Sequence, residues 1–313
     1  MKLRIQDYTI NIIMYHYVRE IKKSFFPNLK GLELEIFKNQ IDFFCHNYNV
    51  ISAIDLKEII TQNKMTRKPC ILLTFDDGYV DHYKNVFPYL IKKKISGCFY
   101  VPSEIIEKKK VLDVNKIHFI LEKMRDSKKI LKEINYILLK YFKKDLYSYD
   151  LTKINLESRY DDKNTVLVKK LLQFFLPEKE RIHIVDKLFH KIVNVDIKKF
   201  SEKLYMNKKN IKEMYKNKMH FGSHGASHFR FGLLNKMEQE REIKKSLSFF
   251  AKNNLNTKEL SICYPYGSYN QNSLQLSKKY KFIFGLTTEV GSIKKKKLNK
   301  FLNYPRLNAN DFL

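Results

Sequence analysis

Short apolar segments alternate with amphipathic segments along most of the chain. The apolar segments have the length of strands, and most end in polar or turn-forming residues: residues 8–18, 70–75, 95–101, 219–223, 260–264, 282–287 and 302–307. Between several of them, apolar residues recur at every third or fourth position, which predicts helices over residues 34–47, 81–94, 236–253 and 271–280. Strands that alternate with helices form parallel sheets, so we expect a parallel α/β sheet or barrel of about seven strands.

Two residues refine the expected helix boundaries. Pro88 lies inside the segment 81–94, where it predicts a kink or a late start, because proline has no amide N–H to donate. Asn235 directly precedes the segment 236–253 and suits the N-cap position, where its side chain can accept a hydrogen bond from the first helical turn. The second helix is therefore expected to begin immediately after Asn235.

Residues from about 104 to 216 follow a different pattern. They contain Lys-rich helical patterns, such as residues 117–142 and 163–176, and almost no glycine. We interpret this region as a helical insertion within a single domain that spans residues 1–313. The insertion has two alternative roles: it covers the domain structurally, or it forms a lid on the substrate side.

The composition is that of a globular protein, and its charge is strongly positive. Hydrophobic residues make up 44% of the chain, and 60 Lys and Arg against 33 Asp and Glu give a net charge of +27. Such a charge favours nucleic acid, an anionic membrane surface or a phosphate-bearing substrate as a partner. It is also typical of a chain that uses lysine as its ordinary surface residue. Charge alone therefore identifies no partner, and no basic motif with stacking aromatics supports nucleic acid.

The cysteines and the apolar segments bear on the compartment. The four cysteines lie far apart without a CxxC pair, which argues against a zinc ribbon and gives no disulfide framework: Cys45, Cys70, Cys98 and Cys263. The apolar run near the N-terminus is interrupted by Asn11 and His16 and lacks the cleavage site of a signal peptide. No uninterrupted apolar stretch approaches the roughly 18 residues of a transmembrane helix. We expect a cytoplasmic location, with association at the inner face of the membrane as an alternative.

Two adjacent carboxylates, Asp76 and Asp77, follow the apolar segment 70–75. Like charges at the end of a buried strand repel and raise each other's pKa unless something compensates them. A divalent metal ion does so if one carboxylate binds it and the other stays free as a base. Adjacent strand residues point to opposite faces, so two roles require the chain to turn here, and Gly78 permits a turn. The alternative is an ordinary Asp-Asp-Gly surface turn.

His224 and His228 follow the segment 219–223 and lie four positions apart. On one helical turn, residues four apart share a face, so both imidazoles can reach one metal ion. With an aspartate from another strand end, they form a site of two histidines and one carboxylate. Such a site leaves a position open for water, as a catalytic metal requires, and Zn²⁺ is the first choice among the divalent ions that fit.

Three motifs stand in order at three expected strand ends: Thr74-Phe75-Asp76-Asp77-Gly78, Ser223-His224-Gly225-Ala226-Ser227-His228 and Tyr264-Pro265-Tyr266-Gly267. Together they resemble signature motifs of the polysaccharide deacetylases, the NodB-homology enzymes of carbohydrate esterase family 4. The resemblance covers residues of about 10–103 and 217–308 and leaves the helical insertion unmatched. It implies a distorted (β/α) barrel that removes N-acetyl groups from sugars. It also implies that Asp76 is the general base, that Asp77, His224 and His228 bind the metal, and that the backbone N–H of Tyr266 holds the oxyanion.

The chain departs from the family pattern at two positions. Many members carry an arginine two residues before the proline of the third motif, where this chain has Cys263, and no histidine follows His228 to serve as the general acid. Met14-Tyr15-His16 resembles the N-terminal histidine motif of the poly-N-acetylglucosamine deacetylase branch, which implies that His16 is the acid. Arg306, at the end of the last expected strand, is expected to replace the missing arginine by pairing with Asp76. A packed core histidine and a structural arginine are the alternatives.

The sequence therefore predicts a metal-dependent hydrolase that removes N-acetyl groups from an amino-sugar polysaccharide or a glycan precursor. Metal-activated water, the Asp76 base and the His16 acid would carry out the reaction. A deformylase or deacetylase of a lipid-linked sugar and a non-catalytic carbohydrate-binding relative are the two alternatives. Among the other histidines, His220 is expected to be packed in the core. His82, which follows the Asp-Asp-Gly turn, is expected to lie at the surface, with a place near the site as the alternative.

Overall fold

The computed structural model describes residues 9–63, 68–158 and 161–312. Its contacts divide the chain into two compact units. The first comprises Met1–Ile21, Gly31–Lys110 and Ser201–Leu313, and the second comprises Lys22–Lys30 and Val111–Phe200. All the site residues expected from the sequence belong to the first unit.

Seven parallel strands close into a barrel in the first unit. They are β1 (Thr9–Tyr15), β5 (Cys70–Phe75), β6 (Cys98–Val101), β7 (His220–Ser223), β8 (Ile262–Cys263), β9 (Gly285–Val290) and β11 (Tyr304–Asn308). Their order is β1-β11-β9-β8-β7-β6-β5, and β5 pairs with β1 to complete the ring. All neighbouring pairs in the ring are parallel. The expected (β/α) barrel of about seven strands is confirmed.

Four shorter strands are not indicated by the hydrophobic pattern. β4 (Asn49–Ile51) pairs parallel with β5, and β10 (Ile293–Lys294) pairs antiparallel with β1. β2 (Val18–Arg19) and β3 (Leu32–Glu33) form a separate parallel pair. These four strands carry too little periodicity of their own to be recognised from sequence, whereas the equally short β8 lies within the apolar segment 260–264.

The barrel strands are buried on both faces. Every residue of β1 and β5 is buried, as parallel strands with both faces covered require. Alternate residues enter different hydrophobic clusters. Ile13 joins the cluster that includes Phe37 of α1 (Leu34–Asn47), whereas Ile12 joins the cluster that includes Tyr100 of β6 and Cys263 of β8. The first cluster therefore lies between strands and helices, and the second fills the barrel.

The helices of the first unit largely follow the expected pattern. Besides α1 they are α2 (Ala53–Gln62), α3 (Phe87–Lys93), α4 (Ser103–Lys108), α10 (Lys208–Lys216), α11 (Lys236–Lys252) and α12 (Gln271–Lys279). A π-helical turn, His82–Val86, precedes α3, so the late start expected from Pro88 is confirmed. Asn235 caps α11 by accepting from the N–H of Glu238, also as expected. The helix α2, which begins after a capping box at Ser52, is not among the helices that the sequence predicts.

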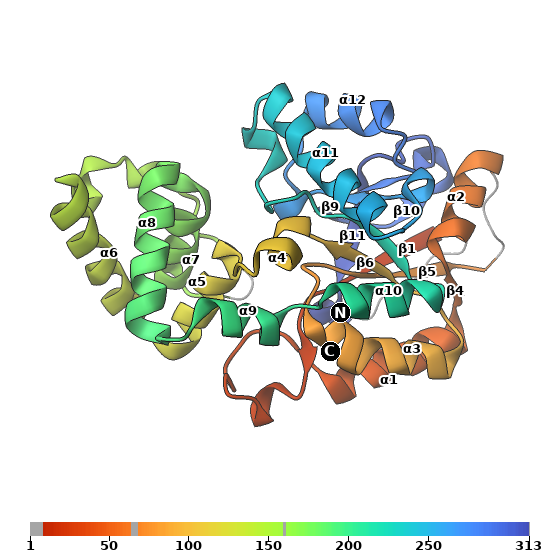
Figure 1. The fold of residues 1–313 in the computed structure, drawn as a ribbon, viewed down its shortest axis with the longest axis horizontal. Coiled ribbons are helices and arrows are strands. Elements are labelled where there is room, and N and C mark those ends of the chain that lie inside the picture. The colour runs from red at the N-terminus through yellow and green to blue at the C-terminus, as the bar shows by residue number, and fades with distance from the viewer. Residues whose placement is uncertain (1–8, 64–67, 159–160, 313) are drawn as a thin grey trace. The chain divides into compact units, whose positions relative to one another are not determined.

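The second unit is helical. It contains α5 (Asp113–Lys123), α6 (Ser127–Phe142), α7 (Lys163–Lys170), α8 (Glu178–Leu188) and the first half of α9 (Ile197–Leu204), with π-helical turns Leu171–Phe175 and Phe189–Val193 after α7 and α8. In Figure 1, α6 lies against α7 and α8. The helical pattern over residues 117–142 divides between α5 and α6, because Asp126 starts a new helix by accepting from the N–H groups of Lys128 and Lys129.

The second unit is shorter than the insertion of about residues 104–216 that the sequence indicates. It runs from Val111 to Phe200, while α4 and α10 belong to the first unit. Residues 22–30 join it, since Phe26 contacts the rings of Phe119 and Phe200. No helix in the described part of either unit is long and apolar enough to cross a membrane.

Candidate metal and catalytic centre

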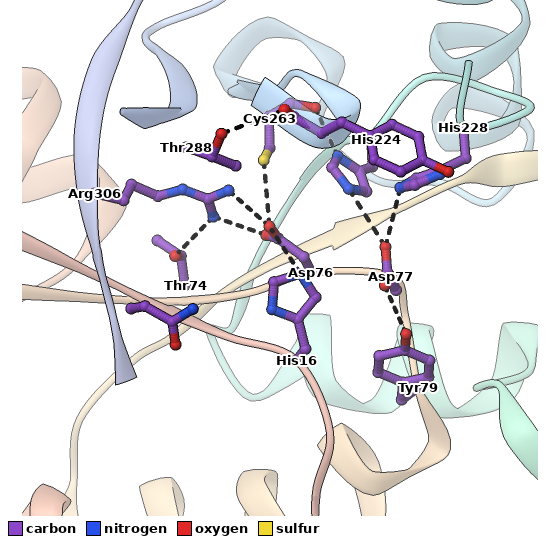
Figure 2. A network of polar contacts seen from close by, with 12 residues as sticks. His16, Thr74, Asp76, Asp77, Tyr79, His224, His228, Cys263, Thr288 and Arg306 are labelled. Carbon is purple, nitrogen blue, oxygen red and sulfur yellow. Dashed lines mark hydrogen bonds and ion pairs between the residues drawn. The ribbon is translucent and has the colours of Figure 1, made fainter. Parts of the chain in front are cut away.

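The polar residues expected to carry chemistry come from the ends of four strands and meet at one end of the barrel. Because the strands are parallel, their C-terminal ends lie together. Asp76 and Asp77 follow β5, and His224 follows β7. His16 follows β1, and Arg306 lies in β11. Figure 2 shows these side chains directed toward one another.

The chain turns sharply at the two aspartates. Asp77 has φ +73° and Gly78 has φ +67°, both in the left-handed region. This region costs energy for a residue with a Cβ, so a left-handed aspartate is a feature that the surrounding structure must stabilise. The turn directs the two buried carboxylates to different partners, as two separate roles require.

Asp77 faces the two histidines with one oxygen. Its Oδ1 lies 3.4 Å from Nε2 of His224 and 3.2 Å from Nε2 of His228. Its Oδ2 accepts a hydrogen bond of 2.6 Å from the Tyr79 hydroxyl. The Nδ1–H of His224 donates to the carbonyl of Cys263 at 2.7 Å, which fixes the orientation of the ring and directs Nε2 at Asp77.

These three residues fit a divalent metal ion. Oδ1 of Asp77 is buried and has no hydrogen-bond partner in the described part of the chain, although two ring nitrogens face it. The three donor atoms lie within 4.8 Å of one another. Two ligands about 2.1 Å from a tetrahedral ion are about 3.4 Å apart, which matches the oxygen-to-nitrogen distances here. The donor set of one carboxylate and two imidazoles suits Zn²⁺ and other first-row divalent ions.

The histidine pair does not lie on a helical turn, contrary to the sequence prediction. Residues 224–228 form a bend, and His228 has φ +62°. The carboxylate of Glu242 in α11 holds this bend: Oε2 accepts from the N–H groups of Ala226 at 3.0 Å and Ser227 at 2.7 Å, and Oε1 accepts from the Ser227 hydroxyl at 3.0 Å. A buried carboxylate from another element, rather than helical periodicity, therefore brings the two imidazoles to one point.

Asp76 pairs with Arg306, as the sequence predicts. The two guanidinium NH groups donate to the two carboxylate oxygens at 2.9 and 2.7 Å, and both side chains are buried. The Nε–H of Arg306 donates to the carbonyl of Thr287, which fixes the guanidinium in place. Burial by itself raises the pKa of Asp76, but Arg306, His224 and His16 outweigh it and lower the pKa to about 2. Asp76 is therefore ionised at neutral pH.

His16 lies at the rim of the site. Its Nε2 is 3.9 Å from Oδ2 of Asp76, and 41% of its side chain is exposed. Its backbone carbonyl accepts from Nε2 of His82 at 2.9 Å. The expected surface location of His82 is wrong, since this residue is fully buried, and burial lowers its pKa to about 4. His82 is an isolated histidine in an ordinary helical pattern, so no sequence signal marks its contact with His16.

Tyr266 occupies a tight turn beside the metal ligands. The turn spans Pro265–Gly267, and Tyr266 has φ +57°. Its carbonyl accepts from the Thr288 hydroxyl at 3.3 Å, and its ring lies 4.8 Å from the ring of His228. His220, by contrast, lies at the start of β7 and bonds to Ser261 through Nε2 at 2.8 Å, in a packed position as expected.

The match to a family of known proteins covers most of these residues. The model of the family described as polysaccharide deacetylase matches residues 63–136 and 187–284, together more than half of the chain. The chain belongs to the polysaccharide deacetylase family. The matched stretches contain Asp76, Asp77, His224 and His228, together with Tyr266. The sequence resemblance to this family is thereby confirmed.

One curated protein and two solved structures are similar to this chain. The putative polysaccharide deacetylase YxkH of Bacillus subtilis (strain 168) is 28% identical over 96 residues, which are 29% of this chain and 30% of that protein. The Streptococcus pyogenes deacetylase PplD, solved in complex with acetate, has a TM-score of 0.59 at 18% identity and covers 97% of this chain and 93% of its own. IcaB from Ammonifex degensii has a TM-score of 0.57 at 14% identity, with coverage of 97% and 92%. The two structures share the fold of this chain.

Proposed function

We propose that this polysaccharide deacetylase is a metal-dependent hydrolase that removes N-acetyl groups from an amino-sugar polysaccharide or its precursor. The observation that carries the proposal is that two adjacent carboxylates contact different partners. Asp77 faces His224 and His228, while Asp76 is held by Arg306 beside them. One aspartate is thus placed to bind a metal ion and the other to act as a base.

Asp77, His224 and His228 would hold the ion. A divalent ion at this position supplies a positive charge that polarises the acyl carbonyl and lowers the pKa of a water molecule beside it. Tyr79 keeps the second oxygen of Asp77 engaged, so that a single oxygen is directed at the ion. The carbonyl of Cys263 keeps the His224 ring in the matching orientation.

Asp76 takes the proton from the attacking water. Its low pKa keeps it ionised at neutral pH, and the carboxylate still has lone pairs available beyond the two that Arg306 occupies. The arginine also fixes the plane of the carboxylate, which aligns the base before the substrate binds.

His16 protonates the departing amine. The amine anion is too poor a leaving group to depart without a proton, so the reaction needs an acid near the base. Nε2 of His16 lies 3.9 Å from Asp76 and is open to the solvent side, where the sugar would lie. The backbone N–H of Tyr266, in its turn beside His228, would donate to the oxyanion that forms as water attacks.

The test compares two adjacent asparagine variants. Acetate release from N-acetylglucosamine oligomers and bound metal would be measured for the wild type, Asp76→Asn and Asp77→Asn. Both variants should lose activity by a factor of about 10²–10⁴. Only Asp77→Asn should also lose bound metal, so the metal content separates the two roles. An Asp76→Asn variant with full activity, or a wild-type protein that binds oligomers but holds no metal and releases no acetate, would contradict the proposal.

The role of Arg306 can be tested in the same assay. Arg306→Lys keeps the positive charge but cannot make two parallel hydrogen bonds, so acetate release should fall by about 10- to 100-fold while bound metal stays unchanged. Arg241→Lys, at an exposed position of α11, is the matched control and should behave as the wild type. Equal activity of the two variants would contradict the positioning role.

A further inference from the structure

The exposed side of α6 in the second unit has an unusual composition. We define the α6 face as five residues that lie on one side of this helix, together with Lys143, the C-cap residue that follows it: Lys129, Lys132, Tyr136, Leu139, Lys140 and Lys143. All six are exposed, with 55% of Tyr136 and 48% of Leu139 accessible. The opposite side of α6 is apolar and buried in the helical unit through Ile130, Ile134, Ile137 and Leu138. The α6 face is therefore free for contact with a partner.

The α6 face carries four lysines and no carboxylate. None of these lysines forms an ion pair within the described ranges of the chain. The neighbouring Glu133 is at the side of the helix and pairs with Lys191. Lys140 instead lies over the ring of Tyr136, at 5.5 Å from its centre, and donates to its hydroxyl. On α11, by contrast, Lys244 pairs with Glu240 one turn earlier.

The α6 face also carries two exposed apolar side chains, Tyr136 and Leu139. Tyr141, on another side of the helix, and Tyr147, beyond its end, are likewise at least 45% exposed. Tyr141 follows at the end of α6 and has Lys187 of α8 over its ring. A solvated lysine helix has no need of such side chains, and their exposure costs free energy unless a partner covers them.

We infer that the α6 face binds an anionic lipid surface. Lysines at a membrane surface are attracted by acidic headgroups, while tyrosine and leucine side chains enter the interfacial layer. A glycan fits less well, because a neutral N-acetylated polymer gains nothing from lysines and a deacetylated one is itself cationic. Nucleic acid also fits less well, since the face contains no arginine and its exposed leucine has no role beside phosphates. This inference is independent of the deacetylase proposal.

The experiment measures binding of the full chain to vesicles of equimolar phosphatidylcholine and phosphatidylglycerol. The test variant is Lys132→Gln/Lys140→Gln/Lys143→Gln, in which glutamine preserves the helix. Each lysine contributes about fivefold to the affinity for an anionic surface, so the dissociation constant should rise by about 100-fold. Leu139→Ser, which removes only apolar contact, should also weaken binding, and this effect should persist at high salt.

A matched triple variant on α10 separates the contribution of the α6 face to vesicle binding from the contribution of the net charge. Lys208→Gln/Lys209→Gln/Lys212→Gln removes the same charge from exposed positions of a helix whose exposed side has no apolar residue. It should keep wild-type affinity, and both triple variants should release acetate from soluble oligomers as the wild type does. Equal loss of binding in the two triple variants, no binding of the wild type to anionic vesicles, or preferential binding to RNA would overturn the inference.

Discussion

Two buried carboxylates next to each other can both stay ionised because each has its own positive partner. Burial alone raises the pKa of both, and it is outweighed by Arg306 at Asp76 and by the two imidazoles at Asp77. The left-handed turn at Asp77 makes this separation possible. The strain of the turn and the cost of burial are thus tolerated at the one place where the chemistry needs two carboxylates with different roles.

His82 makes the stability of the fold depend on pH. Its pKa is about 4 in the folded protein, against about 6.5 in an unfolded chain, because burial disfavours the charged ring. Between these values the unfolded chain binds a proton that the folded chain does not, so the free energy of unfolding falls as pH falls from about 6.5 to 4, by roughly 3 kcal/mol. His82→Gln, which can still donate to the His16 carbonyl, should remove this part of the dependence.

Urea unfolding at several pH values between neutral and about 4 would measure the effect of His82→Gln. His46→Gln, an exposed position of α1, is the control and should leave the dependence unchanged. Some dependence should remain in His82→Gln, because burial lowers the pKa of His220 as well, again to about 4. Identical pH dependence of wild type and His82→Gln would contradict the assignment of a neutral buried ring.

Sequence motifs predict the residues of the site better than the contacts that hold them. Asp76, Asp77 and the two histidines stand in recognisable motifs. Arg306 could be expected only because Cys263 occupies the usual arginine position, and its contact with Asp76 depends on β1 pairing with both β11 and β5 to close the barrel. The support from Glu242 and His82 has no sequence signal, since each is one polar residue within an ordinary amphipathic helical pattern.

At the scale of elements, the site depends on how α11 holds the bend after β7. Glu242 accepts three hydrogen bonds from residues 226 and 227 between the two histidines. Glu242→Gln replaces one acceptor oxygen with an NH₂ group that faces backbone N–H donors. The bend should therefore loosen, and metal affinity should fall by about 10- to 100-fold. Competition with a chromophoric chelator measures the metal dissociation constant directly, without the enzymatic reaction.

Glu240→Gln provides the comparison on the same helix. This carboxylate pairs with Lys279 and Tyr280, away from the bend, so its replacement should leave metal affinity unchanged. If both variants bound metal as the wild type does, the bend would be stable without Glu242. A loss of affinity in both would point to a general effect on α11 instead.

The boundaries of helices and strands can be predicted from sequence where a local signal fixes them. The prediction fails where contacts with distant segments fix them. Asn235 starts α11 through a capping box that is visible in the sequence. The strand β9 begins at Gly285, three residues later than the apolar pattern indicates. Gly285 donates to the carbonyl of Phe301, and a Cβ there would lie 2.2 Å from the carbonyl oxygen of Leu302. The close approach of residues 301 and 302, which are distant in sequence, therefore coincides with the start of β9, and the local pattern does not indicate it.

At the scale of the whole molecule, the proposed chemistry and the proposed membrane contact belong to different units. Every residue assigned to the site lies in the first unit, and the α6 face lies in the second. The alternation of strands and helices predicts the barrel, and the Lys-rich pattern predicts a helical region. The boundary between the units is harder to predict from the sequence. The helices α4 and α10 have the same helical pattern as their neighbours but belong to the barrel unit.

The division into two units predicts that the barrel folds without the helical unit. The hydroxyl of Ser201 donates to the carbonyl of Lys110 at 2.9 Å, so the two ends left by removing Val111–Phe200 are adjacent and a short Gly-Ser linker can join them. Phe26 would then be changed to serine, since its ring contacts are with removed residues. Metal affinity of the shortened chain should stay within about twofold of the wild type, because sites that share no partner act independently.

Vesicle binding by the shortened chain should be lost, because the α6 face is removed with the second unit. A shortened chain that unfolds cooperatively and binds metal but not vesicles would assign the two activities to separate units. Retained vesicle binding would contradict the role of α6, and loss of metal with cooperative unfolding intact would show that the second unit supports the site.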